Sequence, residues 1–355
     1  MESTYVLGIA SYLASGLLGA SFYYPLKKVR GWAWESYWLV YAVTALLLVP
    51  WILAFRFYPD VLGVLSKAEF GTLAACFGFG AMWGVGGLTW GLGIRYLGFG
   101  LGLALACGSC AAFGTLIPPL VAGKMPELLR STHGLVTLGG VAVSLAGIVA
   151  TGLAGMSKER ELSAEAKKAA VPEFNFRKGA FLAVFAGFMS AGMNFGIRAG
   201  DTLKESIPAE LGLKADVLWK GLPVLVVVLL GGFAVNFLWC VGLNARNKTA
   251  GDYVRVRFSL VPNYVLAILA GAIWYSQMLF YTVGDTKMGD FAKYSGWSVQ
   301  MSSQIIFSTL LGLALGEWKG VSPRTRKRVA LGLFLLIAAV FVIGFGKYLE
   351  PPPPR

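Results

Sequence analysis

Apolar runs of about 20 residues recur along the whole chain, and short charged segments separate them. A run of this length is what an α-helix needs to cross the hydrocarbon core of a bilayer, where every backbone polar group must be bonded internally. Charged residues make up only 14% of the 355 residues, against roughly 25% in a typical soluble domain. We therefore expect an all-α membrane protein whose surroundings are the lipid bilayer.

Ten such runs are separated by charged loops, which predicts ten transmembrane helices. Their expected ranges are 4–24, 32–54, 71–93, 99–121, 134–154, 178–197, 221–243, 258–284, 291–316 and 328–348.

Basic residues are distributed unequally between the two sides of this bundle. The odd-numbered loops hold 19 of the 31 Lys and Arg residues, so the positive-inside rule places these loops in the cytoplasm and both termini outside. The same loops account for the net charge of +13, and we expect no nucleic-acid partner. The longest such loop, 155–177, is predicted to be a linker between two halves, 1–154 and 178–348, of a single transporter domain. Residues 349–355, with four prolines in a row, are expected to form a disordered tail.

An internal repeat relates the two halves. The segments "GAMWGVGGLTWGLG" (80–93) and "GAIWYSQMLFYTVG" (271–284) align without a gap, and "SGLLGASFYY" (15–24) is a weaker match to "AGFMSAGMNF" (186–195). Five helices in each half reverse the orientation of the second half, which is the inverted repeat of many secondary transporters. The alternative is a chance similarity between glycine-rich apolar segments. We prefer the repeat, which brings Trp83 and Trp274 to related positions around one cavity.

Amide and aromatic side chains within the predicted helices favour a small neutral sugar as the substrate. An amide both donates to and accepts from hydroxyl groups, and an aromatic face packs on the apolar face of a sugar ring. Each amide alone could instead join two helices by a hydrogen bond. As a set, the expected substrate-binding residues are Trp83, Asn194, Trp274, Gln277, Tyr281, Gln300 and Gln304.

Glu35 is the acid that lies clearly within a predicted helix, one turn from its start. A carboxylate there interacts favourably with the helix dipole, which is a structural role. Alternatively, it carries a proton through the transport cycle. Arg95, expected on the same cytoplasmic side, either pairs with Glu35 as a gate or anchors its helix. If the proton binds nearer the outside, Asp285 and Asp290 are the alternatives.

The sequence does not favour an enzyme. The single histidine, His133, has no serine or metal partner, and there is no phosphate-binding loop. We expect no cofactor and no metal site.

Four segments resemble the L-rhamnose–proton symporter family of the drug/metabolite transporter superfamily. They are "SFYYPLKKVRGWAWESYW" (21–38), "FGAMWGVGGLTWGLGIRYLGFG" (79–100), "GAIWYSQMLFY" (271–281) and "GEW" (316–318). The resemblance implies ten helices, a five-plus-five repeat, the inner membrane, and uptake of L-rhamnose driven by protons. The shared segments contain Lys27, Lys28, Trp34, Glu35, Trp83, Arg95, Trp274, Tyr275, Gln277 and Tyr281.

One segment, "DTKMGDFAKYSGW" (285–297), departs from the family's pattern. L-Fucose, L-lyxose or another related sugar would therefore be a plausible replacement for L-rhamnose. The predicted function is a proton-coupled importer of such a sugar, acting as a monomer or weak dimer. The alternatives are a metabolite exporter or exchanger of the same superfamily and a sugar-sensing membrane protein that does not transport.

Overall fold

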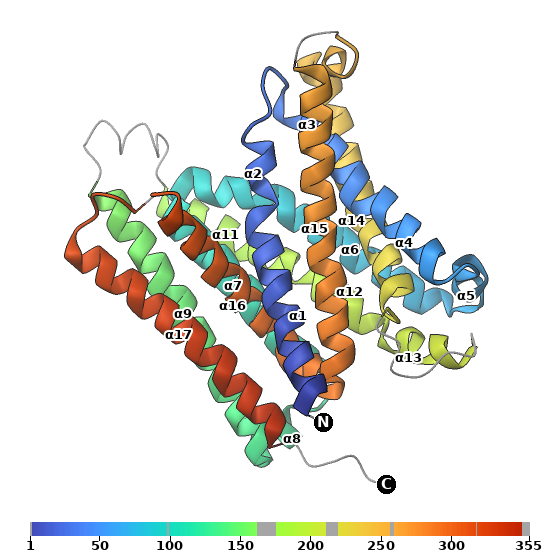
Figure 1. The fold of residues 1–355 in the computed structure, drawn as a ribbon, viewed down its shortest axis with the longest axis vertical. Coiled ribbons are helices and arrows are strands. Elements are labelled where there is room, and N and C mark those ends of the chain that lie inside the picture. Colours follow the sequence, from blue (N-terminus) through green and yellow to red (C-terminus); the bar gives the residue numbers. More distant parts are fainter. Residues whose placement is uncertain are drawn as a thin grey trace.

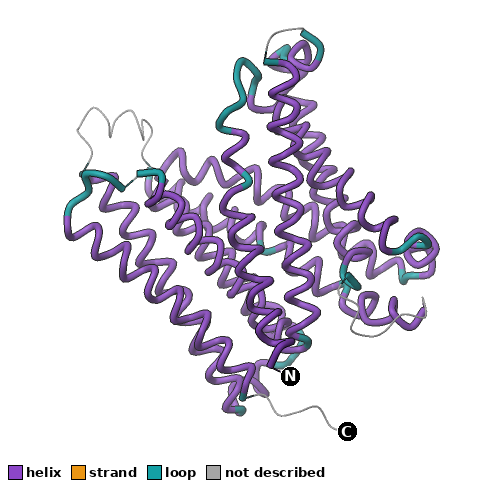
Figure 2. The backbone as a smooth tube through the Cα atoms, in the orientation of Figure 1, coloured by secondary structure: helices purple, strands orange, loops and turns teal. Residues whose placement is uncertain are grey.

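The computed structural model describes residues 2–97, 99–161, 175–210, 219–255, 259–316 and 318–349. These residues form helices joined by turns and loops, without a strand (Figure 2). Eight helices among them are long and apolar enough to cross a membrane, and a shorter apolar helical stretch covers Leu105–Val121. The prediction of an all-α membrane protein is therefore confirmed.

Helices lie over each of the five ranges expected in the first half. The second range is a single continuous helical segment that includes a π-helical turn, η1. Pro50 follows this turn and has no N–H to donate to the preceding carbonyls, which explains the wider turn at this place. The elements are α1 (Glu2–Ser21), α2 (Tyr23–Leu26), α3 (Trp34–Ala42), η1 (Val43–Leu48), α4 (Val49–Phe57), α5 (Val61–Lys67), α6 (Phe70–Leu97), α7 (Phe99–Val121), α8 (Met125–Arg130) and α9 (Thr132–Arg160).

The second half also has helices over its five expected ranges. Its first range is broken at Ala191, between two helices. The elements are α11 (Phe176–Ser190), α12 (Gly192–Ala199), α13 (Asp201–Glu210), α14 (Leu222–Asn247), η2 (Ala250–Tyr253), α15 (Leu260–Met288), α16 (Asp290–Ala314) and α17 (Pro323–Tyr348).

Three sets of contacts organise the helices. α1 packs against α15 and α16, α11 packs against α6 and α7, and α9 pairs along its length with α17. Figure 1 shows α1 beside α15, and the pair α9 and α17 on another side of the molecule. α6 also packs closely on α14, where Gly80 and Gly231 bring the two backbones together. Small residues of this kind allow membrane helices to approach one another.

The connection over residues 200–220 contains a short helix. This helix is α13, and its Lys204 residue is buried, with only 6% exposure. The longer connection, 155–177, begins with the continuation of α9 to Arg160, while residues 162–174 and the tail after 349 lie outside the described part of the chain.

Hydrogen bonds made by Glu161 join the end of α9 to the start of α17. The Glu161 carboxylate accepts hydrogen bonds from the Ser322 amide at 2.7 Å, the Ser322 hydroxyl at 2.6 Å and the Thr325 hydroxyl at 2.5 Å. Because the bonded N–H belongs to the residue before α17, Glu161 satisfies a backbone donor that the helix itself leaves free. These hydrogen bonds hold the pKa of Glu161 below its ordinary value.

We expect Glu161→Ala to lower the unfolding temperature at pH 7. Because the pKa of Glu161 is lowered in the folded state, its stabilisation is present above the ordinary carboxyl pKa of about 4.3 and is lost as pH falls through the lowered value. Thermal unfolding in detergent should show a difference from the native protein that narrows as the pH is reduced from 7. Glu127→Ala, which removes an exposed ion pair with Lys124, is the control and should change little. A difference in unfolding temperature between Glu161→Ala and the native protein that stays constant with pH would contradict the stabilising role assigned to the Glu161 carboxylate.

Candidate functional site

Two tryptophans from the related segments meet at the centre of the site. The rings of Trp83 on α6 and Trp274 on α15 lie with centroids 5.3 Å apart and planes inclined by 31°. Tyr41 on α3 presents an edge to Trp274 at 6.4 Å. Gly232 on α14 makes room for the pair, since a Cβ there would lie 2.6 Å from the Trp83 ring.

Asn194 and Tyr281 form a second contact, between α12 and α15. The Tyr281 hydroxyl donates to the Asn194 Oδ1 at 3.1 Å, and the Asn194 Nδ2 donates to the Gly114 carbonyl at 2.7 Å. The Tyr281 ring contacts Trp297 on α16 and Tyr12 on α1, at centroid distances of 5.9 and 5.6 Å. These contacts join α1, α7, α12, α15 and α16, which are far apart in the sequence.

Several buried polar atoms near these contacts have no hydrogen-bond partner among the described residues. They are the Tyr12 hydroxyl, the Gln277 Oε1, both amide atoms of Gln300 and the Ser303 hydroxyl. Gln300 and Ser303 are completely buried and lie on the same face of α16, three residues apart. An unpaired buried polar group costs about 1–3 kcal/mol. These atoms are therefore suited to hydrogen-bond a hydroxylated ligand or ordered water.

A glycine brings two of the amides close together. A Cβ on Gly19 of α1 would lie 2.0 Å from the Gln277 Oε1 and 3.1 Å from the Gln304 Cδ. The Gln304 Nε2 donates to the Gly19 carbonyl at 3.4 Å, and the Ser15 hydroxyl donates to the Gln277 carbonyl at 2.6 Å. The absence of a side chain at Gly19 thus gives the two amides the space in which they approach α1.

Glu35 lies away from this cluster, at the start of α3. Its carboxylate Oε1 accepts hydrogen bonds from the Asn247 Nδ2 at 3.0 Å and the Thr249 hydroxyl at 2.9 Å, and the residue is 5% exposed. Next to it, Ser36 donates to the Asp252 carboxylate at 2.8 Å. These contacts fasten the beginning of α3 to the connection between α14 and η2. The side chain of Arg95, the expected partner of Glu35, lies outside the described residues.

A charged cluster that we did not predict joins α12, α13 and α15. Asp285 is paired with Lys204 at 2.7 Å and with Arg198, while Asp201 is paired with Lys204 at 2.6 Å and with Arg198 at 3.3 Å. The predicted helices ended at 197 and 284, one residue before Arg198 and Asp285. The spacing of Arg198, Asp201 and Lys204 was the available signal, because Asp201 is three residues from each cation, a spacing at which opposite charges on a helical surface are neighbours.

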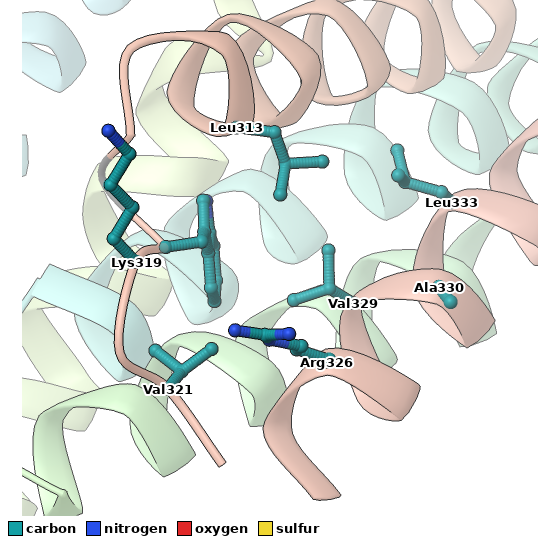
Figure 3. Close-up of a pocket in the computed structure, with 8 residues that line it drawn as sticks. Leu313, Lys319, Val321, Arg326, Val329, Ala330 and Leu333 are labelled. Atoms are coloured by element: carbon teal, nitrogen blue, oxygen red, sulfur yellow. The ribbon is translucent and has the colours of Figure 1, made fainter. Parts of the chain in front are cut away.

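A cavity of about 400 Å³ lies elsewhere, where α16 ends and α17 begins (Figure 3). Its lining is mostly apolar, with two cationic side chains and no amide, and it shares no residue with the amide and tryptophan cluster. This lining is poorly matched to a neutral sugar. It consists of Leu313, Trp318, Lys319, Val321, Arg326, Val329, Ala330 and Leu333.

The structure brings most of the expected substrate-binding residues into contact with one another or with the same helices. Trp83 meets Trp274, Asn194 meets Tyr281, and the amides of Gln277 and Gln304 converge at Gly19. Gln300 lies on the α16 face that also carries Gln304. The arrangement offers aromatic faces and unpaired donors and acceptors without a net charge, which suits a polyhydroxylated ligand.

Comparison with known proteins gives a consistent result over nearly the whole chain. Residues 1–348 match the model of the family described as "L-rhamnose-proton symport protein (RhaT)". Curated relatives named "L-rhamnose-proton symporter" include those of Cronobacter sakazakii, at 35% identity, and of Citrobacter koseri and Yersinia pestis, each at 34%. Each of these alignments covers 98% of this chain and 99% of the relative.

Proposed function

Because this chain belongs to the L-rhamnose-proton symport protein family, we propose that it imports L-rhamnose, or a related deoxysugar, together with protons by alternating access. It is a multi-pass protein of the bacterial inner membrane, and its family is one of transporters, not enzymes. The observation that carries the proposal is the group of buried amide and hydroxyl atoms on α1, α15 and α16 that lack partners among the described residues, together with the contacting rings of Trp83 and Trp274. A sugar supplies the hydroxyl groups that these atoms lack.

The proposed sugar site is the set predicted from the sequence. Gln277, Gln300 and Gln304 bind sugar hydroxyls, and Asn194 and Tyr281 exchange their mutual hydrogen bond for bonds to the substrate. Trp274 packs on the apolar face of the ring, and Trp83 forms the floor beneath it. The hydrophobic methyl group of a 6-deoxysugar matches a site with several aromatic side chains and no buried charge in direct contact with its amides.

We place ten membrane-spanning segments in an inverted repeat, with 1–154 and 178–348 as its halves. Helix contacts support this arrangement, because α1 lies against α15 and α16 as α11 lies against α6 and α7. The first, third and fourth spans are α1, α6 and α7 in the first half and α11, α15 and α16 in the second. In both sets, the first span of one half packs against the third and fourth spans of the other half. α9 and α17, the last span of each half, pair with one another. α1 begins and α17 ends at the same end of the molecule in Figure 1, as expected if both termini lie outside.

Reciprocal side-chain contacts also support the repeat. In the sequence alignment Gly86 corresponds to Gln277, and Gly19 corresponds to Ser190. A Cβ on Gly86 would lie 2.5 Å from the Ser190 hydroxyl, and one on Gly19 would lie 2.0 Å from the Gln277 amide. At each equivalent contact a glycine thus faces a polar side chain, with the roles of the two helices reversed. The larger side chain on α15 enters the proposed sugar site.

Glu35 is proposed to act as the cytoplasmic gate. Its hydrogen bonds to Asn247 and Thr249 hold the start of α3 against the end of α14, and cytoplasmic opening requires these elements to separate. Arg95, on the same predicted side, is assigned to this gate from the sequence alone. The protein is proposed to work as a monomer or weak dimer, since each chain contains both halves of the repeat.

Transport in liposomes tests this function. We expect labelled L-rhamnose, added outside without sodium, to enter vesicles containing the purified protein. A pH-sensitive dye inside should report acidification of the interior as the sugar enters. Unlabelled L-fucose and L-lyxose, added as competitors, measure how narrowly the site selects its sugar, and vesicles without protein are the control. Sugar entry without acidification would contradict proton coupling. If a sugar binds but does not enter, the transporter proposal is wrong.

A further inference from the structure

α12 and α15 face each other through two successive polar contacts. On α12, Asn194 and Arg198 are four residues apart, and on α15 Tyr281 and Asp285 have the same spacing. Tyr281 is hydrogen-bonded to Asn194, and Arg198 is ion-paired with Asp285. Residues four apart on a helix are neighbours on one face. The ion pair therefore lies one helical turn beyond the two proposed sugar-binding residues.

Asp285 is the most buried member of the charged cluster. Its side chain is 3% exposed, against 7% for Lys204, 10% for Arg198 and 16% for Asp201. One carboxylate oxygen is bound by Arg198 and the other by Lys204. The cations come from the end of α12 and from α13, whereas Asp285 belongs to α15. Closure of these elements therefore brings two positive charges to one carboxylate.

From this arrangement we propose that Asp285 binds the transported proton, and that Arg198 and Lys204 displace this proton when α12 and α13 close on α15. The proposal rests on the proton symport of the preceding subsection. When the two cations withdraw, the carboxylate takes up one proton from the outer solution and becomes neutral. When they return, the O–H bond breaks and the proton passes to water at the proposed sugar site, from which it leaves once the cytoplasmic side opens.

The charges of the cluster explain why the proton and the two cations compete. With Asp285 ionised, Arg198 and Lys204 balance Asp201 and Asp285, so the buried cluster is neutral. Protonation of Asp285 leaves one uncompensated positive charge in a buried place, which favours separation of α12 and α13 from α15. Among the described side chains, the other titratable groups facing Asp285 are the Tyr12 hydroxyl from α1 and the Tyr281 hydroxyl from α15.

The same two helices couple the proton to the sugar. A sugar that binds Asn194 and Tyr281 replaces the inner contact between α12 and α15, and a proton on Asp285 removes the outer one. Each ligand therefore makes it easier for the other to separate the helices, which is the differential affinity that coupled transport requires. We make this assignment for the present chain alone.

A charge-balanced double variant separates proton binding from a structural role. Asp285→Asn alone leaves two cations with one anion, whereas Asp285→Asn combined with Lys204→Met leaves Arg198 paired with Asp201. We expect vesicles containing the double variant to exchange labelled for unlabelled L-rhamnose, while sugar entry no longer acidifies the interior. An imposed pH gradient should then fail to concentrate the sugar, so that the ratio of internal to external L-rhamnose falls to about one, the value for a carrier without coupling.

Two comparison variants complete the experiment. The Glu127→Gln and Lys124→Met pair removes an exposed ion pair of the same type and should keep the native number of protons per sugar. Glu35→Gln should also keep this ratio, even if its rate falls. Native acidification by the double variant at Asp285 would overturn the proposal, as would a loss of protons per sugar in Glu35→Gln alone. Failure of the native protein to move L-rhamnose at all would instead show that the proposed function is wrong.

Discussion

A single methyl group added by Gly231→Ala is expected to force α6 and α14 apart and to destabilise the protein severely. A Cβ at this position would lie 2.0 Å from the Phe77 carbonyl oxygen and 2.8 Å from the Ala81 amide nitrogen, both in the backbone of α6. The reciprocal position is equally tight, since a Cβ on Gly80 would lie 1.9 Å from the Val228 carbonyl oxygen. Backbone atoms cannot move aside as a flexible side chain can, so the helices themselves must separate.

Overpacking of a well-packed interior costs about 1–3 kcal/mol, and we expect the upper end of this range or more at a backbone contact. Thermal unfolding and gel filtration in detergent measure the effect. Matched controls exist on both helices, because a Cβ on Gly242 of α14 or on Gly78 of α6 would have no atom within 4 Å. Gly242→Ala and Gly78→Ala should be neutral or slightly stabilising, since alanine is the better helix former. Equal stability of Gly231→Ala and Gly242→Ala would show that the helices do not approach as closely as described.

The glycines of α6 illustrate what the sequence could and could not predict. Glycine is frequent in membrane helices that pack closely, and α6 packs against both α11 and α14. The structure then divides the glycines of α6: Gly80 and Gly84 face α14, Gly86 faces α11, and Gly87 and Gly91 have open space where a Cβ would be. Spacing gives the faces of a helix but does not identify the helix that each face contacts. That information is tertiary.

The internal repeat was the most informative feature for the site. It predicted a relation between Trp83 and Trp274, and the two rings are in contact. The partners of Glu35 could not be predicted, because Asn247 and Thr249 are more than 200 positions away and are aligned with it only by helix packing. The charged cluster was missed for a different reason. Its members lie at helix ends, where an error of one residue decides whether a charge is assigned to a loop or to the protein interior.

Gln300→Leu is expected to impair sugar transport while leaving the fold at least as stable. The Gln300 side chain is completely buried on α16, and neither its amide oxygen nor its amide nitrogen has a partner among the described residues. Leucine has a similar volume and no polar atoms, so the substitution removes an unsatisfied group without leaving a cavity. Replacing such a group by an apolar one is nearly neutral or stabilising, in contrast to breaking a hydrogen bond that has formed.

Binding of the sugar is weakened, because the sugar loses an amide that can both donate and accept hydrogen bonds. At about 0.5–1.5 kcal/mol for each hydrogen bond, two lost bonds reduce kcat/KM by roughly five- to 150-fold. Initial rates of L-rhamnose uptake and unfolding temperatures, measured on the same preparation, test both halves of the prediction.

Ser302→Ala is the matched control on α16, since the Ser302 hydroxyl is bonded to that of Ser144 at 2.7 Å. It should lower stability and spare transport. If Gln300→Leu instead lowers the unfolding temperature and leaves kcat/KM unchanged, the amide holds helices together and the sugar site lies elsewhere. The two variants thus distinguish the Gln300 amide, which is proposed to bind the ligand, from the Ser302 hydroxyl, which already has a partner within the protein.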